Sequence, residues 1–383
     1  MDIQLSQEEY FRYSRHLMLP EVGVEGQKRL KGASVLITGS GGLGSPIALY
    51  LAAAGVGRIG LADYDTVEDS NLQRQIIHGT STVGMFKVES ARARISDLNP
   101  FVQVATYNAV LTSNNISEIA EGYDVLVDGS DNLATRYLLN DFAVINGKPY
   151  IYGSIFRFEG QVSVFDSRNG PCYRCLFPAP PPPELMPSCS SVGVLGVLPG
   201  IIGTIQANET IKVLLGIGQP LIGRLLLLDA QEMRFSEILL RKNPACPVCG
   251  EAPTIHALVD YEQFCGVPYR RAGAQDSPEF DLLPLELYDR LKNGENITLV
   301  DVRDPVESQV SSLPAAINIP LERLLGRLGE IPRDYPVVVF CRTGSRGLQA
   351  AVMLKQAGFP DVKHLKGGIN GWAVQVDPGM KQY

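Results

Sequence analysis

Short apolar runs alternate with helix-type stretches through the first part of the chain. Residues 33–38 (ASVLIT) form a run rich in β-branched side chains, a glycine-rich turn follows, and residues 46–54 have helical spacing. Residues 58–63 form a second apolar run. This strand–helix–strand order predicts a βαβ unit, which requires a parallel sheet.

Further elements extend this pattern on both sides. Residues 1–30 are expected to be helical, because Ser6 and Glu9 have the spacing of a capping box. The other expected elements are a buried parallel strand at 123–128, antiparallel strands within 150–165, a helix at 198–215 and a strand at 224–228. A proline cluster within 176–191 predicts an extended or mobile crossing segment.

The apolar pattern weakens after Cys249 and returns near residue 280. Residues 250–278 contain Pro, Gly and mixed charge, which is typical of a linker. Apolar runs at 297–302 and 337–340 each end in polar residues, with helical stretches between and after them. We therefore expect a second, smaller α/β domain.

Composition excludes several classes of protein. With 383 residues, 45% hydrophobic and 20% charged, low complexity and wholesale disorder are excluded. A net charge of −7 argues against a broad nucleic-acid surface. The N-terminus lacks an apolar signal region, and the most apolar stretch, 192–207, is interrupted by Pro199 and glycines. We expect a cytoplasmic protein that binds neither nucleic acid nor membrane. Seven cysteines, an odd number, favour metal ligands or reactive thiols over a closed disulfide framework.

The glycine-rich turn has the G-x-G-x-x-G pattern of a nucleotide-binding loop. Its glycines are Gly39, Gly41, Gly42 and Gly44. The turn follows a strand and opens a helix, and Asp63 ends the next strand, where a carboxylate can bind ribose hydroxyls. A nicotinamide-dependent oxidoreductase is the default interpretation of such a loop, and a turn required only for packing is the alternative.

The charged residues after this unit favour a triphosphate over a nicotinamide. Residues 63–75 carry carboxylates, amides and Arg74, and Lys87 follows. Arginine and lysine neutralise the charge that develops in phosphoryl or nucleotidyl transfer. Asp131 lies just past a strand end, where a carboxylate can hold magnesium. Any one of these charges alone would be interpreted as a solvated surface residue.

Two cysteine pairs have the spacing of metal ligands. They are Cys172 with Cys175 and Cys246 with Cys249. Four thiolates suit tetrahedral zinc, but the two pairs lie much further apart in the sequence than those of a usual zinc ribbon. Two redox pairs or buried thiols remain the alternatives.

Another cysteine, Cys341, ends an apolar strand and opens a loop that leads into a helix. Backbone N–H groups of such a loop point at the sulfur, and Arg342 and Arg346 add positive charge. Both effects stabilise an anionic sulfur, as in a persulfide. A phosphate-binding loop or a phosphatase-type cysteine is the alternative.

Six motifs between residues 5 and 250 resemble the MoeB/ThiF adenylyltransferases, relatives of the ubiquitin-activating enzymes. They are FRYSRHLMLPEVGVEGQ, GSGGLGS, D-x-D-x-V-x-x-SNLQRQ, VGMFKVESA, DGSDN and VLPGIIGTIQANETIK. The resemblance implies a Rossmann-like domain that binds ATP with Mg²⁺. The implied ATP-binding residues are Gly39, Gly41, Gly42, Gly44, Asp63, Ser70, Asn71, Arg74, Lys87, Asp131 and Asn132. Asp63 would bind the ribose, Asp131 would support magnesium, and Ser70, Asn71, Arg74 and Lys87 would contact phosphates.

The same resemblance implies three further features. Arg15 would reach into the site of a partner subunit, which implies a homodimer; a solvated helix face is its alternative. The four paired cysteines would form a structural zinc clamp. Cys189 would be the catalytic-loop cysteine, although Ser190 and Ser191 stand where the family often has an acidic residue. A buried thiol is the alternative for Cys189.

Residues 280–383 resemble a single rhodanese domain. Leu299–Arg303 (LVDVR) and Leu365–Trp372 (LKGGINGW) are its flanking motifs, and Trp372 is expected in the core. The short loop formed by Cys341, Arg342, Thr343, Gly344, Ser345 and Arg346 fits sulfurtransferases better than phosphatases. Cys265 has no partner motif, and no role is assigned to it.

Together these patterns predict a two-domain α/β protein. A Rossmann-like adenylation domain with a mainly parallel sheet would occupy 1–250, a linker 251–278 and a smaller rhodanese domain 279–383. By the resemblance, the chain would adenylate the C-terminal glycine of a ubiquitin-fold sulfur carrier of the MoaD/ThiS type. A Cys341 persulfide, loaded by a cysteine desulfurase or thiosulfate, would then supply sulfur for a thiocarboxylate. A carrier-binding protein with an inactive rhodanese module is a further alternative.

Overall fold

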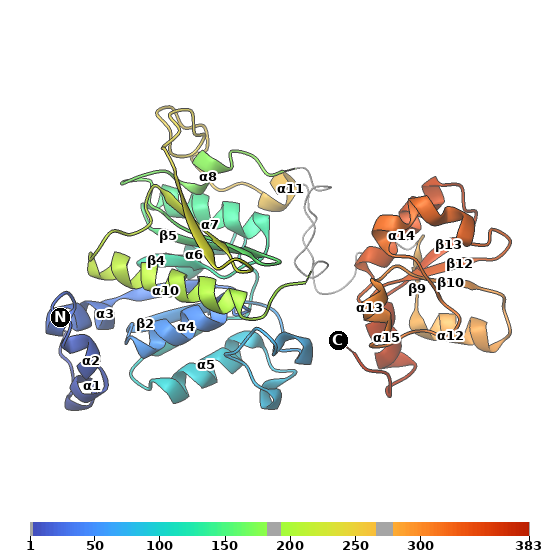
Figure 1. Ribbon diagram of the computed structural model, residues 1–383, viewed down its shortest axis with the longest axis horizontal. Helices are drawn as coiled ribbons and strands as arrows, with labels where there is room; N and C mark the ends of the chain where they lie inside the picture. Colours follow the sequence, from blue (N-terminus) through green and yellow to red (C-terminus); the bar gives the residue numbers. More distant parts are fainter. Residues whose placement is uncertain (1–2, 182–192, 266–278, 383) are drawn as a thin grey trace. The chain divides into compact units, whose positions relative to one another are not determined.

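The computed structural model describes residues 3–181, 193–265 and 279–382. The chain divides into two compact units, Met1–Pro268 and Tyr269–Tyr383, which are described separately (Figure 1). Within the described residues, every helix is too short or too polar to span a lipid bilayer.

The first unit contains an eight-stranded sheet that changes character at its middle. Its strands run in the order β3-β2-β1-β4-β5-β6-β7-β8. They are β1 (Ser34–Thr38), β2 (Arg58–Ala62), β3 (Gln103–Tyr107), β4 (Val125–Asp128), β5 (Tyr150–Phe156), β6 (Glu159–Phe165), β7 (Arg224–Asp229) and β8 (Arg234–Leu239). Pairing is parallel from β3 to β5 and antiparallel from β5 to β8. The predicted parallel unit and the predicted antiparallel strands within 150–165 are both confirmed.

Several helices of the first unit cover the two faces of the parallel half, and the remaining helices pack around them. The helices of this unit are α1 (Gln7–Arg12), α2 (Ser14–Leu17), α3 (Gly23–Gly32), α4 (Gly44–Ala53), α5 (Lys87–Leu98), α6 (Ile116–Ala120), α7 (Leu133–Ile145), α8 (Tyr173–Leu176), α10 (Leu198–Leu215) and α11 (Tyr261–Cys265), with short 3-10 turns η1 (Asp69–Asn71) and η2 (Thr80–Thr82). In β1, Val35 and Ile37 pack into one core with α4 and α10, and Leu36 packs into the other with α6 and α7. Burial on both faces explains why this strand is a continuous apolar run.

The N-terminal region forms three short helices where the sequence predicts one helical stretch. The predicted capping box is confirmed: Glu9 N–H donates to Ser6 Oγ at 3.2 Å, and Ser6 N–H donates to Glu9 Oε2 at 2.7 Å. The chain turns between α2 and α3, where Pro20 interrupts the helical pattern and Gly23 has a φ of +54°. Positive φ is unfavourable for most side chains, so glycine suits this turn.

The segment predicted to be a linker, residues 250–278, contains the short helix α11 (Tyr261–Cys265). Helix α11 packs against α7: the Tyr261 hydroxyl donates to Asp141 Oδ2 at 2.8 Å. The same carboxylate forms a buried ion pair with Arg174, whose guanidinium lies 4.5 Å from the centre of the Phe264 ring. So short a helix shows no recognisable helical periodicity, and the residues that anchor it are distant in the sequence.

The second unit is a five-stranded parallel sheet in the order β11-β10-β12-β13-β9. Its strands are β9 (Asp281–Leu282), β10 (Thr298–Asp301), β11 (Ile317–Asn318), β12 (Val337–Phe340) and β13 (Val362–Leu365). Its helices are α12 (Pro284–Lys292), α13 (Pro305–Ser308), α14 (Ser345–Gln356) and α15 (Gly368–Gln375), with 3-10 turns η4 (Leu321–Arg323) and η5 (Leu325–Glu330). Trp372 is buried in the core, as predicted.

Candidate functional site

The glycine loop, residues 39–44, joins β1 to the N-terminus of α4. Gly39 has a φ of +88°, and a Cβ at Gly44 would lie 1.9 Å from the Gly39 carbonyl oxygen. Side chains are therefore excluded from the tightest part of the turn. The loop brings backbone N–H groups to the start of a helix, an arrangement that suits a phosphate group.

Asp63 follows β2 and fixes the shape of this loop. Its Oδ2 accepts a hydrogen bond from Ser40 N–H at 2.7 Å, and its Oδ1 accepts one from Asp65 N–H at 2.9 Å. Burial raises the pKa of Asp63, and the nearby Lys87 ammonium acts in the opposite direction. A carboxylate at this strand end is positioned to accept ribose hydroxyl hydrogens.

The predicted phosphate-contacting residues gather beside the glycine loop. Lys87, the first residue of α5, pairs with Asp65 Oδ2 at 2.8 Å. A Cβ at Gly42 would lie 3.7 Å from Arg74 Cγ, so Arg74 borders the loop. Ser70 and Asn71 form the turn η1, and the Ser70 carbonyl accepts from Arg74 Nη1 at 3.2 Å. Two cationic side chains therefore lie near the backbone N–H groups of the glycine loop.

The loop after β4 completes this edge of the sheet. Gly129 packs so closely that a Cβ there would lie 2.7 Å from the Gly39 carbonyl oxygen. Asp131 and Asn132 follow with exposed side chains, and Asn132 Oδ1 caps α7 by accepting from Thr135 N–H at 2.8 Å. The exposed carboxylate of Asp131 has the oxygen chemistry that Mg²⁺ prefers.

Arg15 is exposed on α2. Within residues 3–181, 193–265 and 279–382, its guanidinium makes one polar contact, with Met18 Sδ at 4.0 Å. A single copy of the chain therefore does not bring Arg15 into contact with the glycine loop.

Sequence reasoning missed His78, which supports the same loop from behind. His78 Nε2 lies 2.9 Å from the Ser40 carbonyl oxygen, and Nδ1 lies 2.9 Å from Ser90 Oγ. Burial lowers the pKa of His78. Ser40 is thus held through its N–H by Asp63 and through its carbonyl by His78. The position of His78, three residues after Gln75, which ends the SNLQRQ motif, is the signal that could have found it.

The two cysteine pairs, which are far apart in the sequence, come together in the fold. The four sulfur atoms, of Cys172, Cys175, Cys246 and Cys249, all lie within 4.8 Å of one another. Cys175 Sγ is 3.4 Å from Cys249 Sγ, and Cys172 Sγ is 3.6 Å from Cys246 Sγ. Sulfur atoms at ~2.3 Å from one tetrahedral zinc ion would be about 3.8 Å apart. The cysteine cluster therefore has both the donor set and the spacing that zinc requires.

In the second unit, the Cys341 loop (residues 341–346) lies between β12 and α14. Gly344 N–H points at Cys341 Sγ at 3.2 Å, and Gly344 has a φ of +101°. The outward carbonyls of Cys341 and Arg342 accept from Ile369 N–H at 2.8 Å and Asn370 N–H at 3.1 Å. The start of α15 thus holds the loop in a form in which the Gly344 N–H group is directed at the sulfur.

Arg346 lies at the end of this loop and is firmly paired. Its two terminal nitrogens donate to the two carboxylate oxygens of Glu307, each at 2.7 Å. Asp301 and Arg303, in the first flanking motif, form a buried ion pair with Arg303 Nη2 donating to Asp301 Oδ2 at 2.6 Å. These pairs fix the backbone around the cysteine, since paired guanidinium groups have little conformational freedom.

The two remaining cysteines, Cys189 and Cys265, belong neither to the cysteine cluster nor to the Cys341 loop. Cys189 lies outside the described residues, so its role as the catalytic-loop cysteine stays a prediction. Cys265 is buried in α11, where burial raises the pKa of its thiol to about 11. A thiol of that kind is unreactive near neutral pH.

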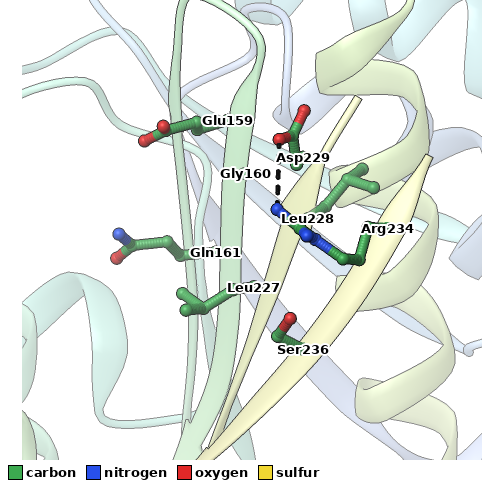
Figure 2. Close-up of a pocket in the computed structure, with 8 residues that line it drawn as sticks. All are labelled: Glu159, Gly160, Gln161, Leu227, Leu228, Asp229, Arg234 and Ser236. Carbon is green, nitrogen blue, oxygen red and sulfur yellow. Dashed lines mark ion pairs between the residues drawn. The ribbon is translucent and has the colours of Figure 1, made fainter. Parts of the chain in front are cut away.

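A shallow hollow of about 250 Å³ lies on the antiparallel half of the first sheet (Figure 2). We call it the strand hollow. It is lined by Glu159, Gly160, Gln161, Leu227, Leu228, Asp229, Arg234 and Ser236. Asp229 and Arg234 pair across its rim at 3.9 Å. No motif in the sequence indicated this hollow, because its residues come from three strands.

Comparisons with known proteins cover both units. Residues 13–248 match the ThiF family, and residues 283–375 match the rhodanese-like domain. "Probable adenylyltransferase/sulfurtransferase MoeZ" of Mycobacterium tuberculosis (strain H37Rv) is 48% identical over 99% of this chain and 96% of its own length. "Adenylyltransferase and sulfurtransferase MOCS3" of Anopheles gambiae is 45% identical over 99% of this chain and 90% of its own length.

Solved structures resemble the first unit. Escherichia coli MccB crystallised with ATP superposes with a TM-score of 0.55 and 23% identity, over 62% of this chain and 74% of MccB. This likeness confirms the Rossmann-like fold predicted from the glycine loop and its flanking strands.

Proposed function

This chain belongs to the ThiF family and carries a rhodanese-like domain, and from this premise we propose that it activates and then sulfurates a carrier protein. It is an adenylyltransferase and sulfurtransferase, and its substrate would be a ubiquitin-fold sulfur carrier with a C-terminal glycine. The observation that carries the proposal is the full-length similarity to proteins named for both activities, at 48% and 45% identity. A nicotinamide-dependent oxidoreductase and an inactive rhodanese module are not favoured.

The first step would be adenylation. An oxygen of the carrier's terminal carboxylate attacks the α-phosphorus of ATP, a new P–O bond forms, and pyrophosphate leaves. The carboxylate is already ionised at pH 7, so no side-chain base is required. Catalysis would then rest on positioning and charge stabilisation.

The residues that surround the glycine loop support this step. Asp63 would bind the ribose, while Arg74 and Lys87, with Ser70 and Asn71, would contact the phosphates. Asp131 would hold Mg²⁺, which would neutralise phosphate charge. The cationic side chains beside the glycine loop favour a triphosphate, because they match its charge.

The second step would transfer sulfur. The terminal sulfur of a Cys341 persulfide attacks the acyl adenylate, AMP leaves, and an acyl disulfide forms. Cys189, as a thiolate, would attack the Cys341 sulfur of that disulfide, forming a Cys189–Cys341 disulfide and releasing the thiocarboxylate. An external thiol would reduce the protein disulfide, and a cysteine desulfurase or thiosulfate would reload the persulfide. The Gly344 N–H group directed at Cys341 Sγ supports an anionic sulfur there.

Three further proposals concern the whole enzyme. The cysteine cluster would hold one structural Zn²⁺, supported by its four sulfur donors. Arg15 would act in a second copy of the chain, so the enzyme would be a homodimer. The reaction would take place in the cytoplasm, where a free catalytic thiol stays reduced.

One experiment tests the activity and identifies the carrier. Purified enzyme and ATP are mixed with carriers from molybdopterin synthesis, thiamine synthesis, tRNA thiolation and cysteine synthesis, and each carrier is weighed by mass spectrometry. Gain of adenylate, or replacement of oxygen by sulfur when a donor is present, would identify the substrate. No change in any carrier would contradict the proposal.

A variant separates the two steps. Cys341→Ala should still exchange pyrophosphate into ATP with the carrier present but should form no thiocarboxylate. Pyrophosphate exchange that is lost together with thiocarboxylate formation would contradict this division between the two units.

A further inference from the structure

Arg136, on α7, is a buried cation without a matching hydrogen-bond partner. Its side chain is 12% exposed, and Nε lies 3.8 Å from Asp128 Oδ2, too far for a hydrogen bond. In the described part of the chain, Nε has no hydrogen-bond partner. Its guanidinium carbon lies 5.5 Å from the centre of the Tyr152 ring. Buried polar groups are nearly always hydrogen-bonded, so a buried Nε–H group without an acceptor indicates a missing hydrogen-bond partner.

Asp128 forms an ion pair with Arg136 but accepts no hydrogen bond from it, because other donors already occupy its carboxylate. Ser130 N–H and Ser130 Oγ–H donate to Oδ1 at 2.8 and 2.6 Å, and the Tyr150 hydroxyl donates to Oδ2 at 2.6 Å. Burial also raises the pKa of Asp128. The arginine therefore retains donors for an anion that comes from outside the chain.

The position of Arg136 narrows the choice of anion. Asp128 ends β4, and the next residue, Gly129, packs against Gly39 of the glycine loop. On the other side, the Tyr152 hydroxyl donates to Gln161 Oε1 at 3.3 Å, and Gln161 lines the strand hollow (Figure 2). Arg136 thus lies between the loop proposed to bind ATP and a surface depression on the antiparallel strands.

We propose that Arg136 binds the terminal carboxylate of the carrier and holds it beside the nucleotide. This inference rests on the proposed function. The carrier carboxylate and the α-phosphate of ATP are both anions and must meet in the reaction. A guanidinium between them reduces their repulsion. Arginine also matches a carboxylate with two parallel N–H···O hydrogen bonds, which fixes its orientation.

The chemistry predicts which kinetic parameter depends on Arg136. Once the carboxylate has become an acyl adenylate, its negative charge is lost and the ion pair weakens. Arg136 would thus act mainly in binding the substrate, so its loss should raise the KM for the carrier far more than it changes the KM for ATP.

The test is a double-mutant cycle between Arg136 and the tail. The probe is the MoaD- or ThiS-type carrier that gains mass in the experiment above, prepared with a C-terminal carboxylate or a C-terminal amide. Amidation should weaken binding to the wild-type enzyme by about tenfold or more, as for a hydrogen-bonded charge. Arg136→Gln should bind both carriers equally weakly, and Arg136→Lys should recover part of the preference for the carboxylate.

Matched controls separate this role from a structural one. Arg58, whose guanidinium carbon lies 4.4 Å from the centre of the Tyr123 ring, is at the opposite, amino-terminal end of the strands. Arg58→Gln should keep the wild-type preference for the carboxylate. Thermal unfolding and ATP binding of Arg136→Gln should stay close to wild type, and an Asp128→Asn/Arg136→Gln double variant removes both charges if the single variant is unstable.

Several results would overturn the proposal. Amidation that leaves binding to the wild-type enzyme unchanged would exclude a carboxylate-binding residue without any variant. If amidation weakens carrier binding equally in the wild type and in Arg136→Gln, another residue binds the carboxylate. If instead the wild-type enzyme modifies no carrier at all, the proposed function itself fails.

Discussion

Single residues around Ser40 show how the glycine loop keeps its shape. Ser40 donates to Asp63 and accepts from His78, so its peptide is held on both sides. Glycine spacing was sufficient to predict a tight turn at Gly39 and Gly44, with Asp63 at the end of the next strand, because each belongs to a local pattern. His78 could not be assigned this way, since its contact to Ser40 crosses 38 positions and depends on the fold.

The buried His78 predicts a pH dependence of stability. Because burial lowers its pKa in the folded state, the unfolded chain binds the proton more tightly. Its contribution to stability is therefore complete above a pH of ~6.5, the ordinary value for histidine, and declines as the pH falls below it. Denaturant unfolding at pH 7.5 and pH 5.5 should show a smaller loss for His78→Gln than for the wild type. Equal losses in the two proteins would assign the pH dependence to other groups.

At the scale of secondary-structure elements, the strand β12 and the helices α14 and α15 together determine the shape of the Cys341 loop in the second unit. The strand β12 and helix α14 follow from their apolar pattern, and the sequence also placed Cys341 between them. The contribution of α15 was less evident, because it depends on Gly368. A Cβ at Gly368 would lie 2.4 Å from the Cys341 carbonyl oxygen, and its φ is +61°.

Gly368 therefore provides a test of the Cys341 loop. Gly368→Ala should distort the loop and reduce sulfur transfer from thiosulfate to cyanide by at least about tenfold, since both the backbone angle and the space exclude a side chain. Pyrophosphate exchange by the first unit should be unaffected. Gly329→Ala, at a glycine with nothing within 4 Å of an added Cβ, is the matched control and should keep full sulfur transfer. Unchanged transfer in Gly368→Ala would show that the loop tolerates displacement.

Helix α11 was not predicted, and the division of the N-terminal helical stretch into α1, α2 and α3 was not predicted either. Helices α1, α2 and α11 are very short, and α11 is held by contacts to Asp141 and Arg174 rather than by its own periodicity. Long-range contacts of this kind are not encoded in local spacing. Strands β1, β2 and β4 were predictable, because they are buried and carry continuous apolar runs. The more exposed strands β3 and β8 were not predicted.

At the scale of the whole molecule, the cysteine cluster joins distant parts of the first unit. We expect one zinc ion per chain, released by a strong chelator, and Cys246→Ser should lose the metal. Because metal binding contributes directly to folding, the variant should unfold several degrees lower than wild type. Metal content by mass spectrometry and thermal unfolding measure both effects, and Cys265→Ser is the control that should keep its zinc. A Cys246→Ser protein of full stability would exclude a structural role.

A second whole-molecule prediction concerns the exposed Arg15. If Arg15 acts in a partner's site, Arg15→Ala and Asp131→Ala should each lose pyrophosphate exchange, yet mixing them should restore activity. Mixed dimers would contain one site with both residues intact, as two-fold symmetry requires. Unmixed variants and a mixture of Arg15→Ala with wild-type-like Arg94→Ala serve as comparisons. Activity that stays absent after subunit exchange would place Arg15 in its own chain's site.

The contact of α11 with Arg174 also limits the distance that the Cys341 sulfur can move away from the first unit. Arg174 lies between Cys172 and Cys175, on the short helix α8. The same helix therefore contributes to the cysteine cluster and to the Arg174–Asp141 pair that contacts α11. Whatever its conformation, a chain spans at most ~3.6 Å per residue. Because α11 is anchored, the segment that joins the two units starts at Cys265 and not at Cys249. Its maximum length to Asp281 is therefore half as great, and the volume that Cys341 can reach is about eightfold smaller. Helix α11, which shares Arg174 with the cysteine cluster, would thereby raise the local concentration of the Cys341 sulfur available to the first unit.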